Sequence, residues 1–374
     1  MITRYIKRII PYQVLIAGIL FQACQLPERS QPWMTSFEKT QINPVLVADS
    51  TFSFQGPMTG QTVHWQKADV FNPAAVVRND SIYLLFRAED NTNATLGHRT
   101  SRIGLAVSID GMHFTKYPTP VLYPDSSEYM KWDWPGGCED PRVVEREDGT
   151  YVMLYTSWNY DVARLSVATS RDLRSWTKYG PVFKDPAHGK FMDMWTKSAS
   201  VVTKMKNGRL IAAKIKNKYW MYWGEEFVNL ASSDDLVHWE PMLIDSGELL
   251  HVMDTRPGMF DSRLTEAGPP ALLTDAGILF FYNGKNKEDG SGDPNVSRGA
   301  YCGGQALFDK NNPSKLIDRM DTPYICPSLP HEITGQYKAG TTFTEGLVYY
   351  KKKWFLYYGT ADSMVGLAVM DDKS

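Results

Sequence analysis

The chain is 374 residues long, which is enough for one large β-domain or for two ordinary domains. It contains 11 Trp, 20 Tyr and 16 Phe together with 28 Gly and 22 Pro, a mixture that favours many short strands and turns over long helices. Forty basic residues against 42 acidic ones give a net charge of −2, and no basic stripe follows the N-terminal segment. The composition therefore excludes a protein that binds nucleic acid through a strongly basic surface.

The N-terminal segment carries the pattern of an export signal. Basic residues within the first eight positions precede an apolar run over residues 9–21, which has the length of a signal-peptide core and is short for a membrane span. Cys24 follows Ala23, as at the cleavage site of a lipoprotein. We expect a signal peptide over residues 1–23, a lipid anchor on Cys24, a tether over residues 24–40 and one folded domain over residues 41–374. The expected location is the cell envelope, in the periplasm or at the outer-membrane surface. The alternative is an ordinary signal peptide or a single membrane anchor, and in either case Cys24 has no role.

The next recognisable feature is a strand pattern that recurs five times. In each copy an apolar, aromatic strand ends in polar residues, at 82–86, 151–155, 220–223, 278–282 and 354–358. A strand of small and apolar residues follows each one, at 103–108, 165–170, 229–233, 304–308 and 365–369. The period of about 60 to 70 residues is typical of propeller blades that carry long loops. The sequence therefore predicts an all-β fold, a five-bladed β-propeller with a funnel on its central axis.

Polar residues at the strand ends are expected to meet in that funnel, because the blades surround one axis. The candidates are Arg87, Glu89, Asp90, Asn159, Glu225, Asn283 and Asp362. The alternative for each is an ordinary turn residue. Five blades that end alike favour a shared pocket lined by several carboxylates.

An acidic motif, Gly-Gly-Cys-Glu-Asp-Pro-Arg over residues 136–142, lies between the first two predicted blades. The adjacent glycines allow close approach of the backbone to a ligand, and Pro141 restricts the turn. The acid pair Glu139 and Asp140 stands where a strand begins. The alternative is a surface turn whose charges pair with one another.

The cysteines of the predicted domain are Cys138, Cys302 and Cys326, an odd number that allows at most one disulfide. We expect free, buried thiols. The chain has no CxxC pair and no Cys/His spacing typical of zinc, so we expect neither a metal ion nor an organic cofactor.

Seven motifs in order resemble the inverting mannoside-active enzymes of glycoside hydrolase family 130, five-bladed propellers that comprise β-mannoside phosphorylases and a smaller set of β-1,2-mannosidases. The resemblance extends over about residues 72–369, with motifs at 72–74, 87–89, 101–104, 137–142, 195–198, 267–270 and 357–362. It implies that Asp140 is the general acid. It also implies contacts with mannose for Asn72, Arg87, Asp90, Ser101, Arg102, Lys197 and Asp362. We add Arg142, Asn283 and Tyr358, which lie in these motifs or at a predicted strand end.

The chain departs from the phosphorylases of the family at acidic positions. Those enzymes typically show Gly-Ala-Gly before the prolines and Tyr-His-Gly at the end of the next strand, where this chain has Glu-Ala-Gly at 266–268 and Tyr-Asn-Gly at 282–284. Glu225 is a second added acid, of the kind that the family's hydrolases have. An inverting hydrolase needs a base across the sugar ring, whereas phosphate needs none and is repelled by carboxylates. We therefore expect Glu225 and Glu266 to activate water in an exo-acting β-mannosidase, with β-1,2-linked mannosides as its substrates.

Two other functions stay open at this point. A β-mannoside phosphorylase would release mannose 1-phosphate, and a glycan-binding propeller would have no catalytic role. One of the two glutamates would then serve as an ion-pair partner of Lys197 or Lys214. Export favours hydrolysis, because a sugar phosphate made outside the cell would be lost.

Overall fold

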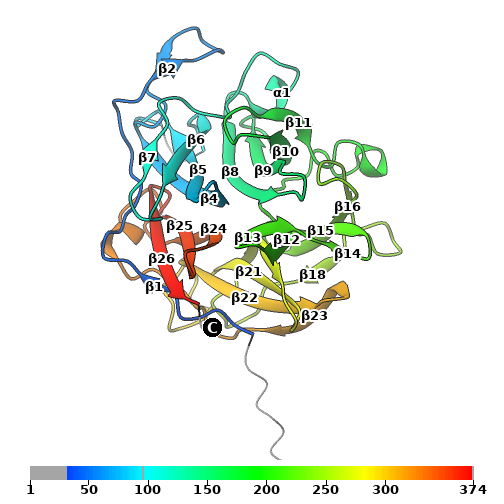
Figure 1. Ribbon diagram of the computed structural model, residues 1–374. Helices are drawn as coiled ribbons and strands as arrows, with labels where there is room; N and C mark the ends of the chain where they lie inside the picture. Colours follow the sequence, from blue (N-terminus) through cyan, green and yellow to red (C-terminus); the bar gives the residue numbers. More distant parts are fainter. Residues whose placement is uncertain (1–31, 95–96, 373–374) are drawn as a thin grey trace, which may run out of the picture. The chain divides into compact units, whose positions relative to one another are not determined.

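The computed structural model describes residues 32–94 and 97–372. Strands make up most of the regular structure in this part of the chain, and the helical segments in it are short: α1 (Met130–Asp133), η1 (Pro186–Gly189) and η2 (Pro330–Glu332). The strands are arranged as blades around a common centre, a five-bladed β-propeller (Figure 1). No helix of the described residues is both long and apolar enough to cross a membrane.

The first two blades follow the order of the chain. The first contains β4 (Asp69–Arg78), β5 (Ser81–Glu89), β6 (Ser101–Ser108) and β7 (Thr115–Lys116). The second contains β8 (Gly137–Glu145), β9 (Tyr151–Trp158), β10 (Ala163–Ser170) and β11 (Thr177–Pro181). All neighbouring strands within these blades are antiparallel.

The next two blades contain additional short strands. The third is built from β12 (Ala199–Lys206), β15 (Lys218–Trp223) and β16 (Val228–Ser233). Two short strands, β17 (Trp239–Pro241) and β18 (His251–Met253), pair with β16. Two others, β13 (Arg209–Ala212) and β14 (Lys214–Ile215), are inserted after β12. In the fourth, β19 (Leu264–Ala267) and β20 (Ala271–Leu273) both pair with β21 (Ile278–Lys285), followed by β22 (Tyr301–Asp309) and β23 (Asn312–Arg319).

The fifth blade is completed by the N-terminal part of the domain. It contains β24 (Thr342–Tyr350), β25 (Lys353–Thr360), β26 (Met364–Asp371) and β1 (Glu38–Lys39), whose two residues pair with β26. The ammonium of Lys39 forms a 2.7 Å ion pair with the buried carboxylate of Glu332. The predicted tether over residues 24–40 is therefore too long, because backbone pairing makes its last residues part of the fold. A small hairpin of β2 (Phe54–Gln55) and β3 (Thr62–Val63) lies outside the blades. Cys24 and the predicted signal peptide lie outside the described residues.

The repeated sequence pattern corresponds to the second and third strands of each blade, which confirms the predicted architecture. The turn after the third strand has the same hydrogen bonds in the first three blades. In the first blade, the hydroxyl of Ser108 accepts the backbone N–H of Gly111 at 2.8 Å, and the carboxylate of Asp110 accepts that of Met112 at 2.8 Å. The Ser170/Asp172 and Ser233/Asp235 turns repeat this arrangement. The recurring Ser/Asp pair is thus a turn signal.

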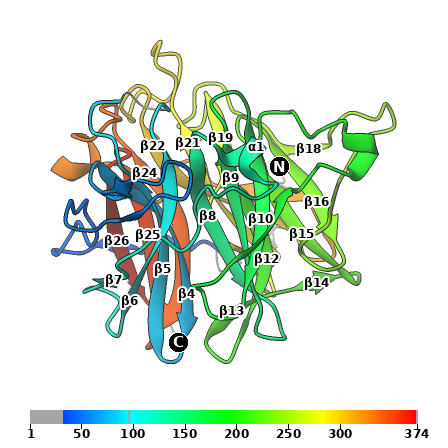
Figure 2. The same ribbon diagram turned by 90° about the horizontal axis from the view of Figure 1, so that it is seen from above.

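Aromatic side chains fill the wedges between blades, which explains why the strands are apolar on both faces. Between the third and fourth blades the ring of Tyr222 lies 4.8 Å from Phe280 and 4.6 Å from Phe308. Figure 2 shows the long strands running between two ends of this unit, with α1 at one end and β13 at the other. The start of β4 pairs with the end of β5, and the start of β8 pairs with the end of β9.

The cysteine prediction is partly wrong. Cys302 and Cys326 form a disulfide, and Cys138 is free and buried. The pairing arises because the returning segment bridges to β22 at Gly303 and Ile325, which brings the two cysteine Cα atoms to 4.5 Å. Sequence spacing alone does not reveal this approach.

Candidate active site

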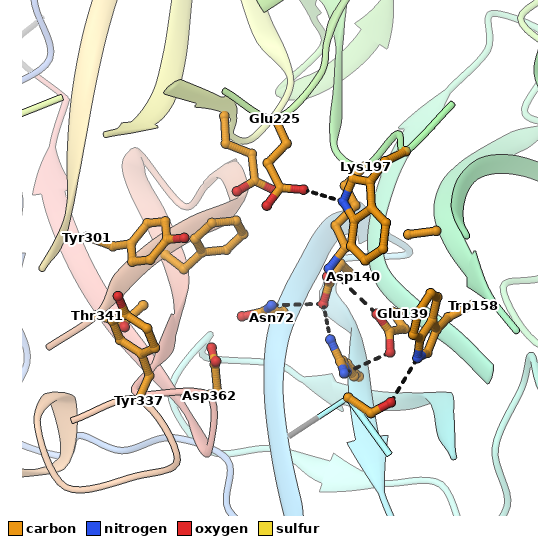
Figure 3. Close-up of a pocket in the computed structure, with 16 residues that line it drawn as sticks. Asn72, Glu139, Asp140, Trp158, Lys197, Glu225, Tyr301, Tyr337, Thr341 and Asp362 are labelled. Carbon is orange, nitrogen blue, oxygen red and sulfur yellow. Dashed lines mark hydrogen bonds and ion pairs between the residues drawn. The ribbon is translucent and has the colours of Figure 1, made fainter. Parts of the chain in front are cut away.

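A cavity of about 300 Å³ lies where all five blades meet. Its size is that of a small-ligand pocket. Carboxylates, cations and aromatic rings line it together: Asn72, Arg87, Gly97, Glu139, Asp140, Trp158, Ala163, Trp195, Lys197, Glu225, Glu266, Tyr301, Tyr337, Thr341, Phe343 and Asp362. Figure 3 shows ten of these residues by label, with Glu225 across the cavity from Asp362.

Asp140 is held in place by an irregular backbone at the start of β8. The register of β8 against β9 shifts between Glu139 and Arg142, and Asp140 itself has a φ of 47°. This left-handed conformation is uncommon for a residue other than glycine and occurs often at functional sites. A Cβ on Gly137 would stand 2.0 Å from the carbonyl oxygen of Ser101. Gly137 therefore permits close packing of β8 on β6, and not the approach to a ligand that its sequence suggested.

The carboxylate of Asp140 accepts a 2.8 Å hydrogen bond from the Asn72 amide. It also forms a 3.2 Å ion pair with the Arg87 guanidinium. Burial alone would raise the pKa of Asp140. The positive charges of Arg87 and Lys197 outweigh that effect and lower the pKa to about 2. Asp140 is therefore ionised at neutral pH in the unliganded protein.

Arg87 joins three carboxylates, two of which line the cavity with it. Its guanidinium lies 2.7 Å from Glu89 and 2.8 Å from Glu139, in addition to Asp140. The hydroxyl of Ser101 accepts a 3.1 Å bond from the same guanidinium. This network fixes the position of Arg87.

Lys197 supplies the second cation of the cavity, with its ammonium 3.9 Å from Glu139. Burial would lower its pKa, but the charges of Glu139, Glu225 and Asp140 raise it above its usual value. Lys197 therefore stays charged and can donate hydrogen bonds to a bound oxygen.

Glu225 and Glu266 reach the cavity from the third and fourth blades. The Trp195 indole donates a 2.8 Å hydrogen bond to Glu225. Glu266 accepts a short hydrogen bond from the Ser198 hydroxyl. Burial, and next the negative charge of Glu225, raise the pKa of Glu266 to about 8. At neutral pH Glu266 therefore carries a proton and Asp140 does not.

A buried ion pair supports Glu266 from below. Arg142 lies 2.7 Å from Glu345 and donates a 2.9 Å hydrogen bond to Ser198, whose own hydroxyl donates to Glu266. Arg142 also donates to the backbone carbonyl of Asp140 at 2.9 Å. It thus contacts both sides of the site without lining the cavity.

Asp362, after β25, lines the opposite part of the cavity. Burial raises its pKa to about 6, with the charges of Asp140 and Glu89 adding to the effect and that of Arg87 opposing it. Asp362 can therefore exchange a proton near neutral pH and can both donate and accept hydrogen bonds with a sugar hydroxyl.

Several residues predicted to contact substrate lie elsewhere. Asp90 pairs with Arg102 at 2.8 Å, beside the cavity, and Ser101 lies behind Arg87. Asn283 and Tyr358 do not line the cavity, and neither does Asn159, which was predicted to point into the funnel. Asn283 accepts two hydrogen bonds from Thr344, Tyr358 donates to Glu332 at 2.9 Å, and Asn159 donates to the Lys131 carbonyl. Side chains along a strand alternate in direction, so a polar strand end does not have to face the axis.

The sequence prediction missed most of the aromatic wall. Tyr301, Tyr337 and Phe343 line the cavity, with ring distances of 5.5 Å and 5.8 Å from Tyr301 to the other two. They lie at or before the starts of β22 and β24, outside the repeated strand pattern. Trp158 ends β9, next to a polar strand end, and Trp195 belongs to the motif at 195–198; those positions were the available signals.

Comparison with known proteins supports one family. A family model described as beta-1,4-mannooligosaccharide phosphorylase, of glycoside hydrolase family 130, matches residues 42–373. A 1,2-beta-oligomannan phosphorylase from Thermoanaerobacter sp. (strain X514) is 31% identical over 83% of this chain and 92% of its own.

Two solved structures are more similar. A glycosyl hydrolase from Bacteroides ovatus is 48% identical, with a TM-score of 0.89 over 91% of this chain and 95% of its own. Another, at 48% identity and a TM-score of 0.90 over 93% of this chain and 96% of its own, is described with the words "The GH130 family of mannoside phosphorylases contains glycoside hydrolases that target beta-1,2 mannosidic linkages in Candida mannan". With these matches, and with its acidic cavity at the centre of a five-bladed propeller, the chain belongs to glycoside hydrolase family 130.

Proposed function

We propose that this protein is an inverting, exo-acting β-mannosidase that hydrolyses β-1,2-linked mannosides. Asp140 is the general acid, and Glu225 and Glu266 activate the attacking water. The observation that carries the proposal is the presence of both glutamates in the same cavity as Asp140, on different blades.

The chemistry of inversion explains why this arrangement matters. One carboxyl group protonates the leaving oxygen while another carboxylate on the opposite face of the sugar activates water, typically about 6.5–9.5 Å away. Phosphate needs no such base, and two added carboxylates disfavour its binding. The similarity at 48% identity to structures described as hydrolases also supports this function, whereas the phosphorylase from Thermoanaerobacter is 31% identical.

The proposal places a requirement on protons. The unliganded site holds its proton on Glu266 and keeps Asp140 ionised, and the reaction needs the reverse arrangement. Substrate binding must therefore raise the pKa of Asp140 and lower that of Glu266.

We also propose that the enzyme works in the cell envelope, anchored through lipid on Cys24. The Cys302–Cys326 disulfide supports an oxidising location. Hydrolysis suits that location because its product, free mannose, does not carry phosphate that the cell would lose.

The test is to incubate the mature protein with β-1,2-mannobiose, with and without phosphate. Mannose formed without phosphate is the expected result. Mannose 1-phosphate formed in a phosphate-dependent reaction would establish a phosphorylase, and binding without cleavage would establish a glycan-binding protein.

A further inference from the structure

Four aromatic rings form a continuous row that begins in the cavity and continues beyond it. The ring of Trp195 lies 5.4 Å from Trp158, Trp158 lies 6.1 Å from Tyr160, and Tyr160 lies 5.6 Å from His98. We call these four residues the aromatic row. Trp195 and Trp158 line the cavity, whereas Tyr160 and His98 do not. The row therefore leads from the reaction site to the protein surface.

The rings are exposed to an extent that protein packing does not explain. Trp195 is 51% exposed and Tyr160 is 38% exposed, although large aromatic side chains normally bury most of their surface. Contiguous exposed apolar surface of this kind commonly marks a binding site.

Their polar edges already have partners. The Trp158 indole donates to the carbonyl oxygen of Gly97 at 3.0 Å, and the Trp195 indole donates to Glu225 at 2.8 Å. These bonds hold the rings in fixed orientations, and ring faces stay available to a ligand. Tyr160 has a φ of 69°, a left-handed conformation unusual for an aromatic residue. The fold thus keeps Tyr160 between Trp158 and His98 despite a backbone preference against it.

We propose that the aromatic row binds the second and third sugar residues of an oligosaccharide chain whose terminal mannose lies in the cavity. The apolar faces of uncharged pyranose rings fit flat aromatic surfaces. This inference rests on the proposed function, since it assumes a mannoside in the cavity, and it adds that the enzyme selects chains of three or more residues over the disaccharide.

The experiment compares kcat/KM for β-1,2-linked mannobiose, mannotriose and mannotetraose. Tyr160→Asn removes the ring, and asparagine tolerates the left-handed backbone. We expect the ratio of kcat/KM for mannotetraose to that for mannobiose to fall about fivefold in this variant, the size of one aromatic contact. His98→Ala should lower the same ratio to a smaller extent.

Tyr349→Ala is the matched control. Tyr349 is partly exposed, lies near the end of β24 and packs edge-on against Trp354 of β25, with ring centres 5.3 Å apart. The Tyr349→Ala substitution should leave the ratio of kcat/KM for mannotetraose to that for mannobiose unchanged. An unchanged ratio in Tyr160→Asn would overturn the proposal.

A binding measurement separates this proposal from the proposed function. Calorimetry with mannotetraose and the Asp140→Asn protein should show weaker binding when Tyr160→Asn is added. If cleavage proves to depend on phosphate, the hydrolase assignment fails, whereas the chain-length ratio still tests the row. If the Asp140→Asn protein binds mannotetraose no more tightly than mannobiose, the row has no such role.

Discussion

Replacing Glu266 by glutamine separates the chemistry of this site from its architecture. Glu266 accepts a hydrogen bond from Ser198, and the amide oxygen of glutamine can accept the same bond. The pKa of about 8 means that the unliganded protein already carries a neutral side chain here at pH 7. Glutamine therefore resembles the resting state in shape and charge, and we expect folding and mannobiose binding to persist.

Turnover should fall because glutamine cannot take a proton from water. General-base catalysis is typically worth about 100-fold or more, equivalent to about 2.7 kcal/mol in the barrier. The assay is mannose release from β-1,2-mannobiose in phosphate-free buffer, with a thermal unfolding curve to confirm an intact fold. Azide should partly restore cleavage of an activated mannoside, because a charged nucleophile needs no base.

Glu226→Gln is the matched control. Glu226 is adjacent to Glu225 but is about half exposed and pairs with Arg263 at 2.7 Å, so its loss should change turnover little. Glu225→Gln should behave like Glu266→Gln. Normal water-dependent turnover in both Glu225→Gln and Glu266→Gln would refute the assignment of these residues to water activation.

Asp140→Asn should remove nearly all turnover, by about 100-fold or more, and spare binding; activity within threefold of the parent would exclude Asp140 as the acid. The kcat/KM for mannobiose should decline as the pH rises through about 8, because Glu266 and Asp140 are then both ionised and neither can supply the proton for the leaving group; a profile that stays flat to pH values well above 8 would contradict the pKa assigned to Glu266. Trp195→Phe keeps an aromatic ring and removes the hydrogen bond to Glu225, so kcat should fall about tenfold, as expected for one bond to a carboxylate, while an unchanged kcat would show that the bond has no catalytic role. Cys24→Ala should abolish incorporation of labelled fatty acid in a bacterial host, and labelling that persists would place the anchor elsewhere.

The sequence was sufficient to predict the blades and part of the site. The repeated strand pairs are local patterns, and they appear in the structure as the second and third strands of each blade. Asp140, Glu225 and Glu266 lie in motifs or strand ends, and the cavity brings them together. Tyr337 could not be predicted in the same way, because it belongs to an irregular segment that reaches the cavity only through its tertiary contacts.

The errors on Tyr358 and on the cysteines have a common physical cause, because both features depend on how distant segments pair in the folded chain. Tyr358 was predicted to contact substrate from its place in a motif, but the direction of its side chain depends on strand register, which a single sequence does not specify. The disulfide between Cys302 and Cys326 was missed because it depends on the return of the chain beside β22.

The pairing of β1 with β26 has a consequence for how the protein reaches its native state. Residues 38 and 369 become neighbours in one blade although nearly the whole domain separates them along the chain. Closing a loop of this length costs entropy that grows slowly with length, but the contact cannot form before both ends exist. Ring closure is therefore a late step of synthesis. A chain that is still being made therefore stays open at its fifth blade until residues 364–371 have been added.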